Sequence, residues 1–163
     1  MADLEFSPID FEAHKALATI IRFDSFVTSF GYDVGFSKFL KEADDYLKWL
    51  QTTLASEPAC AVHMKKDGVI IGQLEIGRQL AANTGNLNLV YVMPGFRGKG
   101  FAEELHAYAV EYFKARGFRK AMLRCSPTNV RGFPFYKRMG WEDKGVDPEH
   151  PEVHWMELML MSR

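Results

Sequence analysis

One stretch, Asn86 to Gly117, constrains the fold more than any other part of the sequence. It begins with an apolar run, Leu87 to Met93, which is typical of a buried strand. A turn rich in glycine follows, and an amphipathic helix is predicted from Phe101 to about Arg116. Gly117 is the residue type that ends a helix in the left-handed conformation. A strand that enters a helix through such a turn is one of the ways in which proteins bind phosphate groups.

The turn itself has the properties of an anion site. The first N–H groups of a helix have no partner within the helix and carry about half a positive charge. Gly98 and Gly100 have no Cβ, so that an anion can approach the backbone, and Arg97 and Lys99 add positive charge. The spacing differs from the P-loop and from the dinucleotide-binding fingerprint. Taken alone, the turn is equally compatible with a tight connection whose cations lie in solvent.

Two segments together carry a family resemblance. The turn and the strand before it resemble the pyrophosphate-binding motif of the GNAT superfamily, the acetyl-CoA-dependent N-acetyltransferases. The matching residues are Val90, Val92, Pro94, Arg97, Gly100 and Ala102. A later segment resembles the second signature of this family, in the same order and at the same separation. Its matching residues are Asn129, Phe135, Tyr136, Gly140 and Trp141. The resemblance is specific between Leu87 and Glu142.

The resemblance implies an N-acetyltransferase that moves the acetyl group of acetyl-CoA to a primary amine by direct attack in a ternary complex. It also implies that the strand before the turn splays from its parallel neighbour to admit the cosubstrate. A non-catalytic module that binds or senses acyl-CoA is the alternative. The cofactor-binding residues that it implies are Val90, Tyr91, Val92, Arg97, Gly98, Lys99, Gly100, Phe101, Ala102 and Asn129.

Two residues are the main candidates for proton transfer. By resemblance Tyr136 is the general acid, since a phenol with a pKa of about 10 can protonate a thiolate whose conjugate pKa is about 8.5. The structural alternative is an ordinary half-buried tyrosine. The family's acid on the central strand is replaced by Asn88, which leaves Glu75 as the best candidate base, with Asp24 and His154 weaker. A lone strand carboxylate is otherwise an edge or solvent-facing residue.

The second signature departs from the family pattern at one place. Pro134 lies between Asn129 and Tyr136, and proline is tolerated only in the first turn of a helix. The helix is therefore predicted to begin near Phe133, which would move Asn129 from its usual contact and leave Tyr136 in place. A turn residue or helix cap is the alternative interpretation of Asn129.

An aromatic segment, Phe23 to Tyr32, has no clean period and is predicted to be a loop or a broken helix. It either covers the core or forms a wall of the acceptor site. The resemblance favours the second interpretation and makes Phe26, Phe30 and Tyr32 candidate acceptor-binding residues.

The remaining pattern predicts one domain, residues 1–163, of the α/β (α+β) class. We expect a mixed, mostly antiparallel sheet with one parallel, splayed pair and helices on both faces. The predicted strands are Leu4–Pro8, Pro58–Met64, Val69–Arg78, Leu87–Met93, Ala121–Cys125, Trp141–Val146 and Val153–Met161. The predicted helices are Phe11–Arg22, Ser37–Ser56, Phe101–Arg116 and Phe133–Met139.

Composition narrows the partners. The chain has 163 residues, 25% of them charged, and a net charge of −1. The overall electrostatic field of the protein therefore does not favour binding to nucleic acid or to an anionic membrane. No apolar run approaches the ~20 residues needed to cross a bilayer. No metal-ligand spacing appears, and Cys60 and Cys125 are expected to be reduced core thiols of a cytoplasmic protein. The acceptor is expected to be a small-molecule or peptide amine, and the sequence allows a homodimer without requiring one.

Overall fold

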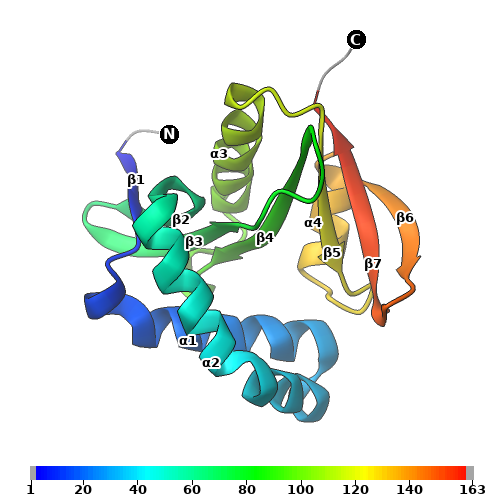
Figure 1. The fold of residues 1–163 in the computed structure, drawn as a ribbon. Coiled ribbons are helices and arrows are strands. Elements are labelled where there is room, and N and C mark those ends of the chain that lie inside the picture. The colour runs from blue at the N-terminus through cyan, green and yellow to red at the C-terminus, as the bar shows by residue number, and fades with distance from the viewer. Residues whose placement is uncertain (1–2, 161–163) are drawn as a thin grey trace.

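The computed structural model describes residues 3–160 of the chain. They form one seven-stranded sheet in the order β1-β2-β3-β4-β5-β7-β6, with helices on both faces (Figure 1). The strands are β1 Leu4–Pro8, β2 Ala61–Lys66, β3 Val69–Ile76, β4 Thr84–Val92, β5 Lys120–Cys125, β6 Glu142–Asp147 and β7 His150–Met159. The helices are α1 Phe11–Phe30, α2 Tyr32–Ser56, α3 Phe101–Ala115 and α4 Gly132–Arg138, with short 3-10 helices at Pro58–Cys60 and Pro94–Phe96.

The predicted sheet is confirmed, including its one parallel pair. Every neighbouring pair of strands is antiparallel except β4 and β5. That parallel pairing is short, because it joins only Thr84–Asn86 to Lys120–Met122. Beyond Asn86, β4 continues to Val92 beside β3 alone. The two strands therefore separate along most of their length, and β5 points away from β4 in Figure 1.

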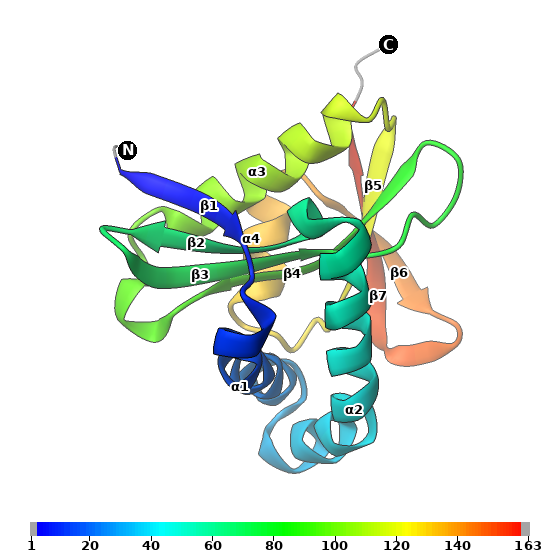
Figure 2. The same ribbon diagram turned by 60° about the vertical axis from the view of Figure 1, so that its left-hand side comes forward.

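Helices α1 and α2 cover one face of the sheet, and α3 and α4 cover the other (Figure 2). The larger core lies on the α3 side, where Leu105 and Phe113 are fully buried against the sheet. A smaller cluster lies on the other face and includes Tyr46 and Leu50 of α2. Burial on both faces explains why the central strands have nearly continuous apolar sequences.

The aromatic segment is helical, which corrects the prediction of a loop there. Helix α1 begins at its predicted cap, Asp10, whose carboxylate accepts from the Ala13 N–H at 3.1 Å, but it continues to Phe30. Only Gly31, with φ of 83°, separates α1 from α2, so α2 begins at Tyr32 rather than Ser37. The irregular pattern arises because these aromatic residues pack between two helices. Ring contacts join Phe23 to Tyr32, Phe36 and Phe39.

Three other predicted elements differ from the structure. Residues 58–60 form a 3-10 helix instead of the start of a strand, because Pro58 fixes φ and has no N–H to donate to a ladder. The predicted loop 147–151 is a tight turn, since Asp147 and His150 pair across it. Strand β7 therefore begins at His150, and the predicted end of the last strand, Met161, lies outside the described residues.

A glycine at the start of β4 offers a test of the packing that holds α3 on the sheet. A Cβ on Gly85 would lie 2.5 Å from Cε1 of Phe113, which is fully buried. Gly85→Ala should therefore lower the free energy of unfolding by about 1–3 kcal/mol in urea titrations. Gly95→Ala is the control, because a Cβ there meets nothing within 4 Å and φ is not positive. Equal stability of the two variants would contradict this packing.

Candidate functional site

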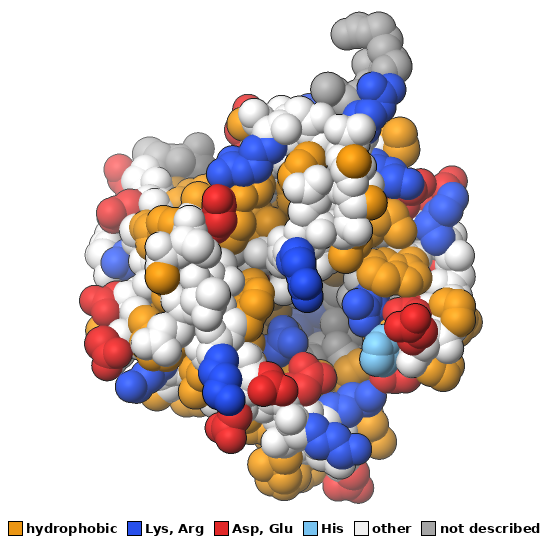
Figure 3. Space-filling model, viewed as in Figure 1, with side chains coloured by type: hydrophobic (Ala, Val, Ile, Leu, Met, Phe, Trp, Pro, Cys, Tyr) orange, Lys and Arg blue, Asp and Glu red, His pale blue; other side chains and the backbone are white. Residues whose placement is uncertain are grey.

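A cavity of about 890 Å³ lies where β4 and β5 separate. Five parts of the chain line it: the second half of β4, the turn before α3, the end of β5 with α4, the start of β7, and the facing sides of α1 and α2. Figure 3 shows the molecule hollowed near the middle of this face, with Lys and Arg side chains around the hollow. The two segments that carry the family resemblance therefore border one space.

Strand β4 presents to this cavity a backbone edge that no neighbouring strand pairs with, although the Val92 carbonyl on it accepts from Arg97 Nε. The Met93 N–H donates to the Ile71 carbonyl of β3 at 2.9 Å. Because backbone groups alternate in direction along a strand, those of Val92 and Val90 point to the opposite side, toward the gap left by β5. Both residues line the cavity, as does Tyr91. An extended ligand in the gap could therefore pair with this edge as an added strand.

The glycine turn places free N–H groups at the same cavity. Gly98 and Gly100 have φ of 74° and 89°, and a Cβ on either would meet nothing within 4 Å. Within residues 3–160, the backbone N–H groups of Gly98 and Gly100 donate no hydrogen bond. The N–H groups of Phe101 and Ala102, in the first turn of α3, have no partner within the helix. Open space in front of several unpaired donors is what an anion site requires.

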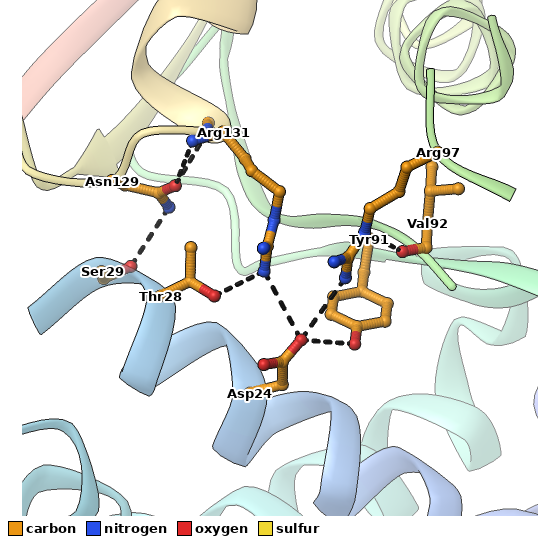
Figure 4. A network of polar contacts seen from close by, with 9 residues as sticks. Asp24, Thr28, Ser29, Tyr91, Val92, Arg97, Asn129 and Arg131 are labelled. Atoms are coloured by element: carbon orange, nitrogen blue, oxygen red, sulfur yellow. Dashed lines mark hydrogen bonds and ion pairs between the residues drawn. The ribbon is translucent and has the colours of Figure 1, made fainter. Parts of the chain in front are cut away.

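Arg97 does not reach into that space. Its Nε donates to the Val92 carbonyl at 2.8 Å, and its Nη2 lies 3.4 Å from Asp24 Oδ2 (Figure 4). The guanidinium carbon also lies 5.2 Å from the centre of the Tyr91 ring. In this conformation Arg97 ties the turn to β4 and α1, whereas Lys99 is exposed and does not line the cavity.

Asp24 of α1 joins three elements around the cavity. Its Oδ2 accepts from the Tyr91 hydroxyl at 2.6 Å and lies within 3.5 Å of Nη2 of Arg97 and of Arg131. Arg131 also donates to the Thr28 hydroxyl of α1 at 2.5 Å. The end of α1 is thereby held to β4, to the turn and to the loop before α4 (Figure 4). Sequence spacing gives no signal of this network, because Asp24 lies more than 60 residues from Tyr91, Arg97 and Arg131.

Asn129 lines the cavity and also acts as a local cap. Its Oδ1 accepts from the N–H of Gly132 at 2.8 Å and of Arg131 at 3.2 Å, and its Nδ2 donates to the Ser29 hydroxyl at 3.2 Å. Helix α4 begins at Gly132, one residue before the predicted start, so that Pro134 falls in its first turn. The oxygen and the nitrogen of the Asn129 side chain thus both form hydrogen bonds within this structure, the oxygen at the start of α4 and the nitrogen to α1.

Tyr136 lies on α4 and lines the cavity beside Cys125, at the end of β5. Its ring makes edge contacts with Phe135 and Trp141 at centroid distances of 5.4 and 6.0 Å. Burial, together with the nearby Cys125, raises the pKa of the Tyr136 phenol well above its ordinary value. The hydroxyl therefore stays protonated at neutral pH and is available as a proton donor.

Glu75 is fully buried, which is not the edge or solvent-facing position that the sequence left open. Its Oε2 accepts from the Tyr46 hydroxyl at 2.5 Å and from Gln73 Nε2 at 2.8 Å. Burial raises the pKa of its carboxyl, while the charge of Arg22 and these hydrogen bonds act in the opposite direction. Glu75 is not among the residues that line the cavity, although Arg22 is.

The weaker base candidates lie elsewhere. Asp24 is held in the network described above. His154 Nδ1 lies 2.9 Å from Oδ1 of Asp143, and His154 is not among the residues that line the cavity. Sequence reasoning missed Tyr46, although its spacing from Ala43 and Leu50 places it on the buried side of a helix.

The aromatic candidates for acceptor binding divide into two groups. Phe26 and Phe30 line the cavity from α1. Tyr32 does not, because it is 64% exposed and stacks on Phe36 at the tip of the α1–α2 hairpin. Two ion pairs border the same end of the cavity: Lys38 with Glu152 at 2.6 Å, and Arg22 with Glu42 at 3.5 Å. The sequence did not indicate these four charged residues.

Two further classes of site can be assessed from the described residues. Among residues 3–160, no three His, Cys, Asp or Glu side chains come together in an arrangement that could hold a metal ion. No helix in the described part of the chain is both long and apolar enough to cross a bilayer.

Comparison with known proteins agrees with this geometry. The family model described as the acetyltransferase (GNAT) family matches residues 24–141. The chain belongs to this family. An uncharacterized N-acetyltransferase of Methanocaldococcus jannaschii is 32% identical over 120 residues, which cover 71% of this chain and 52% of that protein. The chain therefore matches about half the length of this curated relative.

Solved structures show the same fold at low identity. The PaiA N-acetyltransferase of Thermoplasma acidophilum, in complex with coenzyme A, has a TM-score of 0.77 and 19% identity, covering 96% of this chain and 99% of its own. The yncA protein of Salmonella typhimurium, solved with acetyl-CoA, has a TM-score of 0.68 and 18% identity, covering 99% and 96%. The predicted GNAT fold is thus confirmed.

A buried histidine beneath this site gives a prediction for pH. The Trp141 Nε1–H donates to His106 Nε2 at 2.9 Å, and burial lowers the pKa of His106, with the charge of Glu103 offsetting part of the effect. A folded-state pKa below the unfolded value of about 6.5 means that stability is lost as the pH falls below that value. His106→Gln keeps an acceptor for Trp141 and does not titrate. Chemical denaturation at pH 8 and pH 5 should show a smaller loss in the variant, and identical losses would refute this.

Proposed function

We propose that this GNAT protein is an acetyl-CoA-dependent N-acetyltransferase that acetylates a primary amine by direct attack in a ternary complex. The observation that carries the proposal is that the glycine turn, the unpaired edge of β4 and the hydroxyl-bearing Tyr136 all border one cavity. The two related structures solved with coenzyme A or acetyl-CoA support the choice of cosubstrate.

The turn is the proposed pyrophosphate site. The N–H groups from Gly98 to Ala102 would donate to the phosphate oxygens, and the open space before Gly98 and Gly100 admits them. Lys99, and Arg97 if it leaves Asp24, would add positive charge. Asn129 is proposed to contact the cosubstrate arm from the opposite wall, with its backbone or with a side chain released from Ser29.

The edge of β4 is the proposed site of the pantetheine arm and the acetyl group. Val90 and Val92 would pair with the arm as an added strand, and Tyr91 lies between them. A backbone N–H on this edge would also polarise the thioester carbonyl as its oxygen becomes an anion. No side chain is needed for this step, because fixed amide dipoles stabilise the charge.

Tyr136 is the proposed general acid. The amine nitrogen attacks the carbonyl carbon, a C–N bond forms, and the C–S bond breaks as the tetrahedral intermediate collapses. The Tyr136 hydroxyl then gives its proton to the departing thiolate, and the phenolate is reprotonated from the amine side through solvent. The raised pKa keeps the Tyr136 phenol protonated before transfer and makes it a weaker acid, so the transfer requires the thiolate to lie directly against the hydroxyl.

Glu75 remains the proposed base that receives the proton of the acceptor amine. A free alkylamine has a pKa of about 10.4, so it must lose a proton before it attacks. Because Glu75 does not line the cavity, it would act through an intervening group or water. Phe26 and Phe30 are the proposed walls of the acceptor site, and we assign no role there to the exposed Tyr32.

A second candidate is a non-catalytic module that binds acyl-CoA. Its support is the separation of Glu75 from the cavity and the presence of Asn88 on β4 at the position of the family's acid. A screen of primary amines with acetyl-CoA, in which the release of free thiol is measured, distinguishes the enzyme from the binding module. Turnover with any amine supports the enzyme, whereas binding of acetyl-CoA without turnover across the panel supports the module.

Gly100→Asp tests the pyrophosphate site. The new side chain would place volume and negative charge where the phosphates are proposed to lie, so the affinity for acetyl-CoA should fall by ~100-fold or more in calorimetric titrations. Gly68→Asp is the matched control, because Gly68 in the β2–β3 turn also has a positive φ, of 79°, and open space around its Cβ position. Wild-type affinity in Gly100→Asp would overturn the site.

Tyr136→Phe tests the general acid. Loss of the hydroxyl should lower kcat by roughly 10²–10⁴-fold and leave the affinity for acetyl-CoA unchanged. Tyr108→Phe is the control, since the Tyr108 hydroxyl donates to the Ala59 carbonyl, and Tyr108 does not line the cavity. If both variants keep the wild-type kcat, Tyr136 is not the acid.

A further inference from the structure

A buried polar cluster lies beneath α1 and α2, on the face of the sheet next to the cavity. It centres on Glu75, and Gln73 connects it to His63 of β2 through a hydrogen bond of 2.8 Å between Gln73 Oε1 and His63 Nε2. His14 of α1 lies against His63 at a centroid distance of 5.5 Å. Tyr46 of α2 covers the cluster on the side of that helix, and its hydroxyl donates to Glu75 Oε2. Such a cluster is costly to bury, so its charge state needs a physical explanation.

Arg22 of α1 connects this cluster to the cavity. Its guanidinium carbon lies 5.0 Å from the centre of the Phe26 ring and 5.1 Å from that of Tyr46, and its Nη2 lies 3.5 Å from Glu42 Oε1. The same side chain lines the cavity. Arg22 thus lies between an exposed carboxylate on α2 and the buried carboxylate of Glu75.

Two atoms at this junction are buried without partners. They are Nε of Arg22, which is a donor, and Oε1 of Glu75, which is an acceptor. Both known hydrogen bonds of Glu75 go to its other oxygen, Oε2. An orphaned donor and an orphaned acceptor of opposite charge are complementary, and each keeps the capacity for one hydrogen bond to a water molecule.

We propose that Arg22 is a positioning residue that keeps Glu75 ionised and connects it to the cavity, so that Glu75 can take the proton of the acceptor amine. The inference rests on the proposed function, which it deepens. The path runs from the amine N–H through a water held at Arg22 Nε to Oε1 of Glu75. One proton leaves the ammonium group and one carboxylate becomes a carboxylic acid, so the step is balanced.

The surroundings explain why Arg22 is needed. Burial favours the neutral acid, and among the described groups that face Glu75, Tyr46 and Gln73 supply only uncharged donors. His63 cannot help, because burial lowers its pKa to about 4 and leaves it neutral at pH 7. Arg22 supplies the full positive charge that lowers the pKa of Glu75. Arg22 also forms an ion pair with Glu42, but the Glu42 carboxylate is half-exposed, so water screens that interaction.

The test compares Arg22→Gln with Arg22→Lys. In Arg22→Gln, which lacks the positive charge, the acidic limb of the plot of kcat against pH should move to higher pH by about one unit or more. At pH 7, kcat should fall on the order of 10–100-fold. KM for acetyl-CoA should not change, and Arg22→Lys should restore most of the wild-type profile. Arg116→Gln is the matched control, since Arg116 also stacks on a tyrosine, Tyr112, and pairs with a glutamate, Glu57, away from the cavity.

A second readout does not require turnover. The infrared carbonyl band of a protonated, buried carboxylic acid, identified by its loss in Glu75→Gln, should appear at a higher pH in Arg22→Gln than in the wild type. An unchanged band and an unchanged profile would overturn the role of Arg22. Wild-type kcat in Glu75→Gln at every pH would remove Glu75 from the reaction. If the wild type acetylates no amine while the band shifts, the proposed function fails and only the electrostatic link remains.

Discussion

The early separation of β4 from β5 is the constraint on which the rest of the structure depends. Three residue pairs, from Thr84 to Asn86 of β4, hold the strands together, and beyond them the inner edge of β4 has no strand beside it. An open edge inside a sheet is normally a liability, because its N–H and C=O groups need partners. Here the gap is walled by α1, α2 and α4, which converts the unpaired edge into a cavity of about 890 Å³.

The turn before α3 and the end of α1 complete this cavity in different ways. The turn leaves its N–H groups free, and its arginine folds back onto the carbonyl of Val92. Helix α1 is held across the opening by Asp24, which contacts β4, the turn and the loop before α4. Since the contacts of Asp24 are partly exposed, each contributes modestly, and the three together fix where α1 lies. The same helix carries Phe26 and Arg22 to the proposed acceptor side.

Much of the fold could be predicted from sequence, because the signals were local. The apolar run before Pro94, the glycines of the turn and the Asp-Gly pair of the β2–β3 hairpin each specify their own backbone. The helical continuation of α1 through Phe23 was not predictable, since its aromatic residues pack between two helices and obscure a single period. The burial of Glu75 under Tyr46 and the folded-back Arg97 were not predictable either, because both depend on contacts between distant segments.

The central claim is that the gap between β4 and β5 and the glycine turn bind one molecule of acetyl-CoA. A crystal structure of the protein soaked with acetyl-CoA tests it most directly. The account predicts the pyrophosphate against the N–H groups from Gly98 to Ala102, the pantetheine arm along Val90 and Val92, and the thioester sulfur facing Tyr136. A ligand bound elsewhere, or a cavity that stays empty at saturating acetyl-CoA, would contradict it.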